Sequence, residues 1–312
     1  MDEWLFEYEQ LMFGPERTRA SMEQAAEMKF AHMPEKVYKY RTFCDNHKQA
    51  LQDSVLYSSL PTSFNDFIDT NLIISELAKR RMTQKVYDSF REKYGFPKAE
   101  VSSNHDFLKI AEEYIRKAAG ENIDPMPEAK LITLNQMLDR GRQQIVEERQ
   151  KQLRSVYSVC CFSANNKSSL MWAHYADSSK GFCVEYAFKK EGIKADNVQL
   201  LFPVLYKSDA RMLVDDIDET DSSYLMYAAT VKDNQWQYEQ EWRRFYLGDD
   251  VGPKKMPLPT AIYLGTRVKP ENEEWMRDFC RDRIELYKMK YDQESNSLVP
   301  IAAPAWRRWT MS

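Results

Sequence analysis

Glycine is scarce in this sequence, with 9 among 312 residues. A phosphate-binding loop rich in glycine therefore has little material, and neither a Walker loop nor a G-x-G-x-x-G pattern occurs. The 5 cysteines include the adjacent pair Cys160 and Cys161, and no C-x-x-C or H-E-x-x-H spacing is present. These absences argue against a zinc site. They also favour reduced thiols, so we expect no metal and a cytoplasmic protein.

Long apolar runs and an excess of positive charge are missing as well. No segment approaches the roughly 20 apolar residues that span a bilayer, and the first residues, MDEWLFEYEQ, lack the basic region of a signal peptide. We therefore expect no membrane partner. The formal net charge is −4, whereas general nucleic-acid binders usually carry a basic excess that neutralises phosphates. This net negative charge argues weakly against a general nucleic-acid-binding protein.

The sequence pattern changes twice along the chain, which predicts three parts. Residues 1–34 are typical of a helical arm. Residues 70–154 show helical periodicity, with Asn104 as a candidate cap and Gly120 as a stop, and predict a helical insertion. Residues 35–69 and 155–312 contain short strand-like runs without strict βαβ alternation. We therefore expect an α+β core with a mixed or antiparallel central sheet.

The first candidate site segment is Tyr38-Lys39-Tyr40-Arg41, in a predicted strand. Alternate residues of a strand face opposite sides, so Lys39 and Arg41 would share one face. Two cations on one side could bind a diphosphate. The alternative is an edge strand whose charges are solvated and protect it from aggregation.

The second segment runs from Cys161 to Asp177. Ser163 follows a predicted strand, and the next helix places Trp172 and Tyr175 three residues apart on one face, with His174 between them in sequence. Two aromatic rings could form a wall for a planar ligand. The alternative reading is ordinary core packing, which is the more common fate of a large aromatic residue such as Trp172.

The third segment, Trp236 to Arg244, contains Glu239 and Glu241 two residues apart. In an extended chain both carboxylates would point the same way, which suits general-base work or stabilisation of positive charge. The alternative is that the two glutamates pair with Arg243 and Arg244, as surface ion pairs commonly do.

These segments, in this order, resemble the domain-of-unknown-function 2971 family of bacterial proteins. The resemblance covers roughly residues 36–290, with 70–154 as a variable insert. Two positions depart from the family pattern, because Phe67 stands where a proline is usual and Ser179 where a histidine is common. The residues that carry the resemblance are Tyr38 to Arg41, Phe64-Asn65-Asp66, Asp69, Cys161 to Ser163, Leu170 to Asp177, Lys180 to Cys183, Glu185-Tyr186, Tyr238-Glu239 and Glu241 to Arg243.

The layout of that family is similar to ADP-ribosyltransferase-like folds, and this similarity implies a site for NAD as substrate. Glu241 would stabilise the sugar cation of the transition state, and Glu239 would engage the acceptor. Lys39 could take the place of Arg41 in the first strand. The residues that the similarity places against NAD are Lys39, Tyr40, Arg41, Phe162, Ser163, Trp172, His174 and Tyr175.

The leading hypothesis is therefore an ADP-ribosyltransferase with a protein or nucleic-acid acceptor, or an NAD glycohydrolase, acting as a toxin or phage-defence effector with a possible inhibitor or antitoxin partner. A second hypothesis is a non-catalytic module that binds a nucleotide or a protein. A third hypothesis is a nucleic-acid-binding protein. It would use Lys167, Lys180, Arg243, Arg244 and the segment Trp306 to Trp309, because arginine and aromatic side chains can stack on bases.

Overall fold

The computed structural model describes residues 3–14, 16–64, 66, 69–70, 72–74, 76–120, 124, 127–208, 212–214, 223–248, 251–281 and 283–302. The chain divides into two compact units. The first comprises residues 1–70, 155–210 and 223–312, and the second comprises residues 71–154 and 211–222. Asn65, Phe67 and the segment from Trp306 to Trp309 lie outside the described residues.

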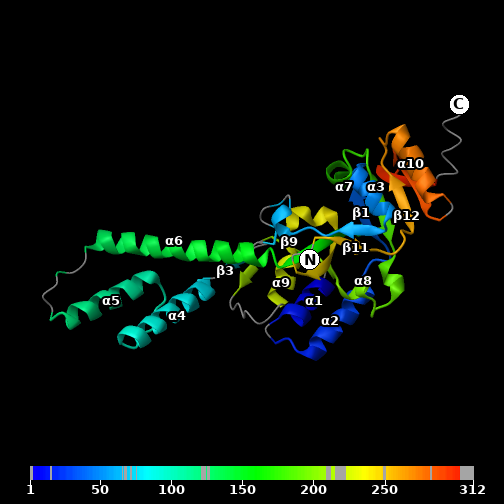
Figure 1. Cartoon of the computed structure of the whole chain (residues 1–312). Coiled ribbons are helices and arrows are strands. Elements are labelled where there is room, and N and C mark those ends of the chain that lie inside the picture. The colour runs from blue at the N-terminus through cyan, green and yellow to red at the C-terminus, as the bar shows by residue number, and fades with distance from the viewer. Residues whose placement is uncertain are drawn as a thin grey trace. The chain divides into compact units, whose positions relative to one another are not determined.

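The first unit is an α+β structure built on a large sheet, which confirms the predicted fold class (Figure 1). The sheet is mixed, because β12 and β13 run parallel and the other described pairs are antiparallel. Within the described residues, the sheet contains in spatial order β14 (Ser297–Ala302), β13 (Glu285–Asp292), β12 (Ala261–Leu264), β5 (Phe182–Tyr186), β1 (Val37–Arg41), β4 (Tyr157–Ser163), β10 (Glu241–Leu247) and β6 (Leu201–Pro203).

Helices of the first unit pack on both faces of this sheet. One face carries an apolar cluster that includes Phe162, Trp242 and Met276, and the other carries Tyr40, Trp172 and Cys183. The helices are α1 (Glu3–Phe13), α2 (Arg19–His32), α3 (Asp45–Gln52), α7 (Ser169–Tyr175), α8 (Asp196–Gln199), α9 (Ser223–Thr230) and α10 (Pro270–Cys280), with 3-10 turns η1 (Pro61–Ser63), η2 (Phe188–Glu191) and η3 (Asn234–Glu239).

Two small sheets complete the first unit. One pairs β2 (Val55–Tyr57) with β11 (Pro253–Lys255), and the other pairs β7 (Leu205–Lys207) with β9 (Val231–Asp233). The sequence predicts a single strand from Leu201 to Tyr206. In the structure this segment is divided into β6, which pairs with β10, and β7, which pairs with β9.

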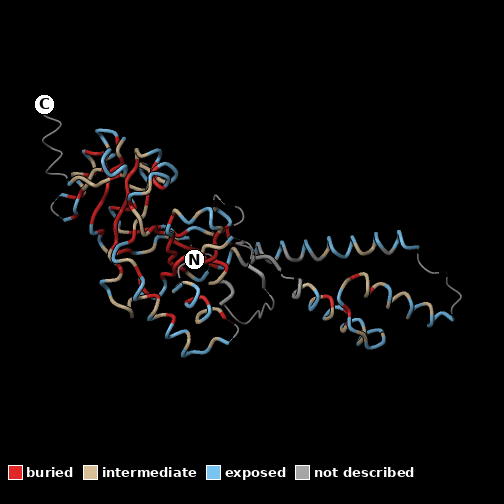
Figure 2. The backbone as a smooth tube through the Cα atoms, turned by 180° about the vertical axis from the view of Figure 1, so that it is seen from behind, coloured by how far each residue is buried: buried red, intermediate tan, exposed pale blue. Residues whose placement is uncertain are grey.

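The second unit is mainly helical. Figure 2 shows that most residues of α6 whose burial is described are exposed, whereas buried residues gather along the sheet of the first unit. The expected cap shifts by one residue, because the Ser103 side chain, and not Asn104, accepts the first-turn N–H of Asp106. The elements are α4 (Glu76–Tyr94), α5 (Asn104–Ala118), α6 (Glu128–Leu153) and the parallel pair β3 (Leu72–Ile74) and β8 (Met212–Val214).

The large sheet opens between β1 and β4. β1 pairs with β5 along all five of its residues. Toward β4 it makes only one pair, Tyr38 with Ser163, and beyond this pair the two strands diverge. We call this divergence of β1 and β4 the fork. Side chains of the two strands that face the fork are not covered by a neighbouring strand. Among the described residues, no helix is both long and apolar enough to cross a membrane.

Candidate functional site

A cavity of about 260 Å³ lies at the fork. Arg41, Ser163 and Glu241 all line it, although they lie far apart in sequence. The residues from the three candidate segments that border the cavity are Tyr38, Lys39, Tyr40, Arg41, Cys161, Phe162, Ser163, Met171, Tyr175, Trp236, Glu239, Glu241 and Arg243. Residues from elsewhere also contribute, among them His47, Phe64, Asp69 and Lys232.

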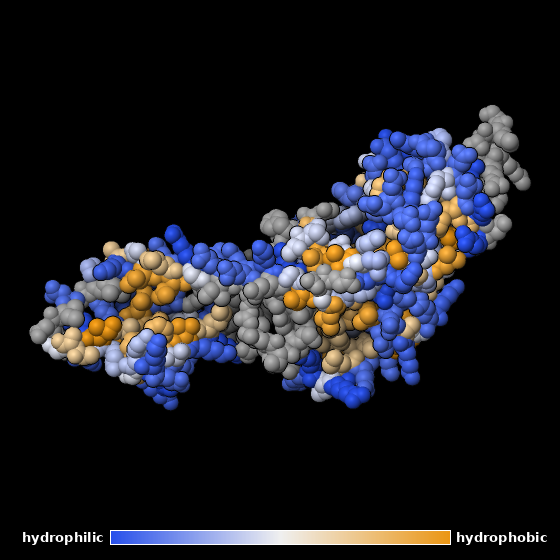
Figure 3. All heavy atoms as spheres, in the orientation of Figure 1, coloured by the Kyte–Doolittle hydropathy of each residue, from blue (hydrophilic) through white to orange (hydrophobic). Residues whose placement is uncertain are grey.

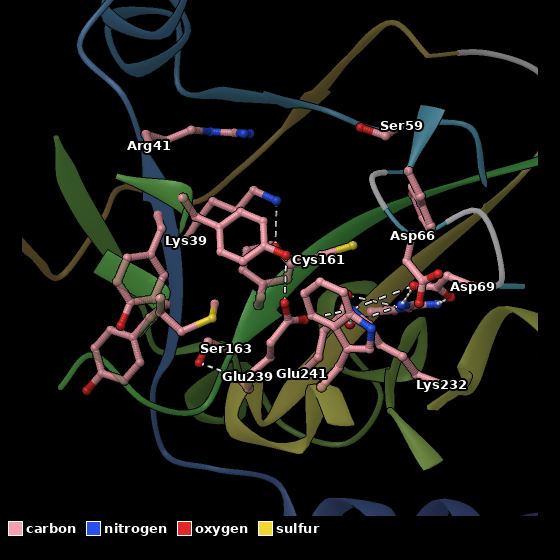
Figure 4. Close-up of a pocket in the computed structure, with 18 of the residues that line it drawn as sticks. Lys39, Arg41, Ser59, Asp66, Asp69, Cys161, Ser163, Lys232, Glu239 and Glu241 are labelled. Atoms are coloured by element: carbon pink, nitrogen blue, oxygen red, sulfur yellow. Dashed lines mark hydrogen bonds and ion pairs between the residues drawn. The ribbon is translucent and has the colours of Figure 1, made fainter. Parts of the chain in front are cut away.

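Lys39 and Arg41 form the cationic side of this cavity. The Lys39 ammonium donates to the backbone carbonyl of Cys161 at 2.6 Å and lies 5.9 Å from the Phe162 ring centre. Figure 4 shows Arg41 reaching from β1 into the space above Lys39. Among the described residues, neither cation has a carboxylate within ion-pair distance. Burial and the neighbouring Arg41 charge lower the pKa of Lys39.

Across β4 lies a buried ion cluster of three carboxylates and two cations. The Lys232 ammonium is 2.6 Å from Glu239, 3.0 Å from Glu241 and 3.6 Å from Asp69. The Arg243 guanidinium binds both oxygens of Asp69, at 2.9 and 2.6 Å, and also binds Glu241 at 2.9 Å. With all groups ionised, the cluster carries one carboxylate in excess. Figure 4 shows the side chains of Asp69, Lys232, Glu239 and Glu241 converging.

The two glutamates reach this cluster by a route that the sequence did not predict. Glu239 is the last residue of the 3-10 turn η3, and Gln240 adopts a left-handed conformation with φ of 45°. Glu241 then begins β10. The expectation of one extended Glu-x-Glu strand is therefore wrong. The carboxylates still meet, because the Lys232 ammonium bridges them.

The surroundings change the proton affinities of the two glutamates in opposite directions. Burial and the charge of Glu241 raise the pKa of Glu239. Although burial alone would raise the pKa of Glu241, the charges of Arg243 and Lys232 lower it far below its ordinary range. Two neighbouring carboxylates with divergent pKa values are typical of acid–base sites, although structural ion networks produce such shifts too.

Several of the predicted site residues border the cavity, but they hydrogen-bond to other protein groups or pack in the core. The Ser163 hydroxyl donates to the backbone carbonyl of Glu239 at 2.6 Å, which ties the end of β4 to η3. Tyr40 points into the core, where its hydroxyl donates to Asn165. Phe162 belongs to the apolar cluster on one face of the sheet. Tyr175 donates its hydroxyl proton to the Glu239 carboxylate at 2.6 Å.

Two predicted ligand-binding residues do not reach the cavity. Trp172 is fully buried, its indole N–H donates to Asn166 and its ring packs edge-on against Tyr40. Its position matches the core-packing alternative. His174 is exposed on α7, next to the Tyr238 ring. On a short helix, the face that buries Trp172 cannot also turn His174 toward the fork.

The sequence pattern does not single out Asp69, Lys232 or Arg243 as site residues. In the sequence, Arg243 and Arg244 are equivalent candidates for pairing with the glutamates. In the structure only Arg243 lies in the ion cluster, because Arg244 points to the opposite face of β10, over the Tyr246 ring. Asp69 and the Trp-Arg pair after Glu241 were visible in the family pattern. Lys232 had no such signal.

The ion cluster has no room for a metal ion, because Lys232 occupies the space among its carboxylates. Across the part of the chain that the structure describes, no group of three or more His, Cys, Asp and Glu side chains could hold a metal. The lining could instead hold an anionic organic ligand, with Lys39 and Arg41 on its negative groups.

Comparison with known proteins identifies one family. The family model described as "Protein of unknown function (DUF2971)" matches residues 171–244. The match spans α7 to the first half of β10 and so contains Tyr175, Lys232, Glu239, Glu241 and Arg243. No curated protein and no solved structure gives a significant match to the chain.

Proposed function

We propose that this chain, a member of the DUF2971 family across residues 171–244, is an enzyme that consumes NAD and transfers ADP-ribose to a macromolecular acceptor or to water. The charge distribution of the cavity carries the proposal. Two cations that have no ion-paired carboxylate among the described residues lie on β1, and a buried cluster with one carboxylate in excess lies across β4.

The cationic side suits the diphosphate of NAD. Holding a partly buried cation without an opposite charge is costly, and a bound anion removes that cost. The Arg41 guanidinium can bind phosphate oxygens through two parallel hydrogen bonds, whereas the Lys39 ammonium acts as a point charge. Both side chains belong to the same strand, so one diphosphate can lie against them together.

The anionic side suits the cleavage of the bond between ribose and nicotinamide. When the C1′–N bond breaks, its electron pair leaves with nicotinamide and positive charge develops on the ribosyl ring. A fixed negative charge stabilises that state more than it stabilises the ground state. The acceptor then forms a bond to C1′, and its proton passes to a carboxylate of the cluster.

The arrangement of the strands gives separate support. ADP-ribosyltransferase-like folds use a first-strand cation, a second-strand serine element and a late-strand Glu-x-Glu. Here Arg41, Ser163 and Glu241 lie on the adjacent strands β1, β4 and β10. The cavity of about 260 Å³ lies just below the usual range for small-molecule sites and can enclose the nicotinamide ribosyl part of NAD. The side chains of Tyr175 and Trp236 provide aromatic walls.

One observation favours a second candidate, a module that binds a nucleotide without turning it over. Lys232 and Arg243 already neutralise most of the negative charge of the cluster, and a fully paired network stabilises a fold without reacting. Such a module would bind NAD or ADP-ribose at the same cations and release no nicotinamide. Turnover therefore separates the two candidates.

The test is nicotinamide release from NAD, measured with the wild type and with Arg41→Met. We expect the wild type to release nicotinamide, and Arg41→Met to raise KM roughly tenfold or more, because a charge-assisted hydrogen bond contributes about 1.5–3 kcal/mol. Arg267→Met, which removes an exposed cation outside the cavity, is the matched control. Binding without release supports the module, and absence of both binding and release rejects the NAD proposal.

A further inference from the structure

The two glutamates of the cluster differ in how many hydrogen bonds they can still accept. Each carboxylate oxygen has two lone pairs. Glu241 Oε2 accepts from Lys232 Nζ at 3.0 Å and from Arg243 Nη2 at 3.0 Å, so both of its lone pairs are used. Glu241 Oε1 accepts from Arg243 Nε at 2.9 Å, and the Cys161 thiol also hydrogen-bonds to the Glu241 carboxyl group.

Glu239 keeps free acceptor capacity on both of its oxygens. Oε1 accepts from the Tyr175 hydroxyl at 2.6 Å, and Oε2 accepts from Lys232 Nζ at 2.6 Å. Among the residues that the structure describes, no donor reaches the second lone pair of either oxygen. Glu239 borders the cavity, so these lone pairs are available to a bound ligand. Figure 4 shows Glu239 beside Glu241.

Glu241 is also held more rigidly than Glu239. Arg243 connects it to Asp69 through two hydrogen bonds, donates to the Ala229 carbonyl at 2.8 Å and lies over the Phe64 ring. Any movement of Glu241 toward a ligand would break a buried pair, which is strongly destabilising. Glu239 has fewer bonds to give up: turning toward a ligand breaks its bonds to Tyr175 and Lys232, and Lys232 then stays paired with Glu241 and Asp69.

We infer that Glu239 is the carboxylate that contacts the reacting ligand and takes the proton of the acceptor, and that Glu241 is a positioning residue. This inference rests on the proposed NAD chemistry. The nucleophile of the acceptor forms its bond to C1′ as the C1′–N bond breaks toward nicotinamide, and the proton of that nucleophile moves to a free lone pair of Glu239. Water later removes the proton. The charge of Glu241 holds Lys232 and Arg243 in place throughout.

The electrostatics agree with this division of roles. The pKa of Glu239 is raised by burial and by Glu241, which makes Glu239 the better proton acceptor of the two. The pKa of Glu241 is lowered by Arg243 and Lys232, so it stays ionised and is a poor base.

The experiment compares Glu239→Gln with Glu241→Gln by nicotinamide release, by NAD affinity and by thermal unfolding. We expect Glu239→Gln to keep the unfolding midpoint within a few degrees and to lose turnover by about a hundredfold or more, and Glu239→Asp, which keeps the charge, to recover part of it. Glu241→Gln should lower the midpoint by on the order of 10 °C and, per folded molecule, lose less turnover than Glu239→Gln.

Glu185 offers a matched control on the other side of β1. It is a buried carboxylate that also accepts from a tyrosine, Tyr263 at 2.6 Å, and pairs with a lysine, Lys36 at 2.9 Å. It lies outside the cavity. Glu185→Gln should therefore change thermal stability and leave nicotinamide release per folded molecule unchanged.

Two results would overturn the assignment: a larger turnover loss in folded Glu241→Gln than in Glu239→Gln, or full turnover in Glu239→Gln. The second result is decisive even if Glu241→Gln does not fold. If the wild type releases no nicotinamide, the NAD proposal fails, and labelling with a water-soluble carbodiimide and an amine, read by mass spectrometry, still tests which carboxylate is open. Modification of Glu239 alone supports the inference, and modification of Glu241 or of neither contradicts it.

Discussion

At the scale of single residues, two glutamates two positions apart acquire different properties from their neighbours. Arg243 and Lys232 surround Glu241, whereas Glu239 shares Lys232 with it and otherwise contacts a neutral tyrosine. Because the folded-state pKa of Glu241 lies below its ordinary value, Glu241 stabilises the fold above about pH 4.5. That contribution is lost as the pH falls through its folded-state pKa. Glu239, with a raised pKa, has the opposite effect.

The pH dependence of turnover should report the proton on Glu239. Its pKa is raised above the ordinary 4.5 by burial and by Glu241, so we expect kcat/KM to fall on acidification at a pH above 4.5. The Tyr175 hydroxyl stabilises the ionised form. Tyr175→Phe should raise the pKa of Glu239 further and move the acidic limb to higher pH. The measurement is a pH profile of kcat/KM for nicotinamide release by both proteins.

The control for this prediction is Tyr263→Phe, which removes the equivalent tyrosine donor from Glu185, outside the cavity. Its acidic limb should coincide with that of the wild type. A limb that stays in place or moves to lower pH in Tyr175→Phe would show that another group titrates in the rate-limiting step.

At the scale of elements, the fork depends on the close approach of Gly181 to β1. A Cβ at Gly181 would lie 2.1 Å from the backbone oxygen of Arg41 and 2.9 Å from that of Ala176. We expect Gly181→Ala to displace the end of β1, to cost on the order of 2 kcal/mol or more of folding free energy, and to weaken NAD binding by moving Arg41. Urea unfolding and calorimetric NAD titration measure the two effects.

Gly141→Ala is the matched control for that substitution. Gly141 lies in α6, and a Cβ there would meet no atom within 4 Å. Alanine is favoured over glycine in a helix by about 1 kcal/mol, so the control should be neutral or stabilising and should bind NAD as the wild type does. If Gly181→Ala and Gly141→Ala have the same unfolding free energy and the same NAD affinity, the close approach at Gly181 does not fix the position of β1.

The sequence predicted the elements of the site better than their geometry. The alternation of polar and aromatic residues in β1 and the helix stop at Gly120 depend on neighbours in sequence, and both appear in the structure. The ion cluster could not be derived in this way. It joins Asp69 to Arg243 across 174 positions, and it depends on the left-handed Gln240 that turns η3 into β10. Pairings of that kind arise only when distant segments pack together.

At the scale of the whole molecule, the two units differ in the amount of core that they contain. The sheet of the first unit lies between large apolar clusters. The buried cluster described in the second unit is small and consists of Tyr87, Val101 and Phe107. Figure 3 shows hydrophobic side chains at the surface of the helices α4 to α6. Phe90 and Met137 are examples, with exposures of 40% and 62%.

This difference predicts unequal local stability. Protection of a backbone amide against hydrogen exchange follows the free energy needed to open the surrounding structure, and that free energy grows with buried apolar contact. We expect the amides of α4, α5 and α6 to exchange faster than those of β4 and β10 by a factor on the order of ten or more. Native-state hydrogen exchange with mass spectrometry measures this directly, on helical peptides from 76–118 and 128–153 and on strand peptides from 157–163 and 241–247. The expectation assumes that the helical unit opens without the sheet. Equal protection in both sets of peptides, lost together as denaturant is added, would mean that the units unfold as one cooperative structure, and the small cluster around Tyr87 would then not limit the stability of the helices.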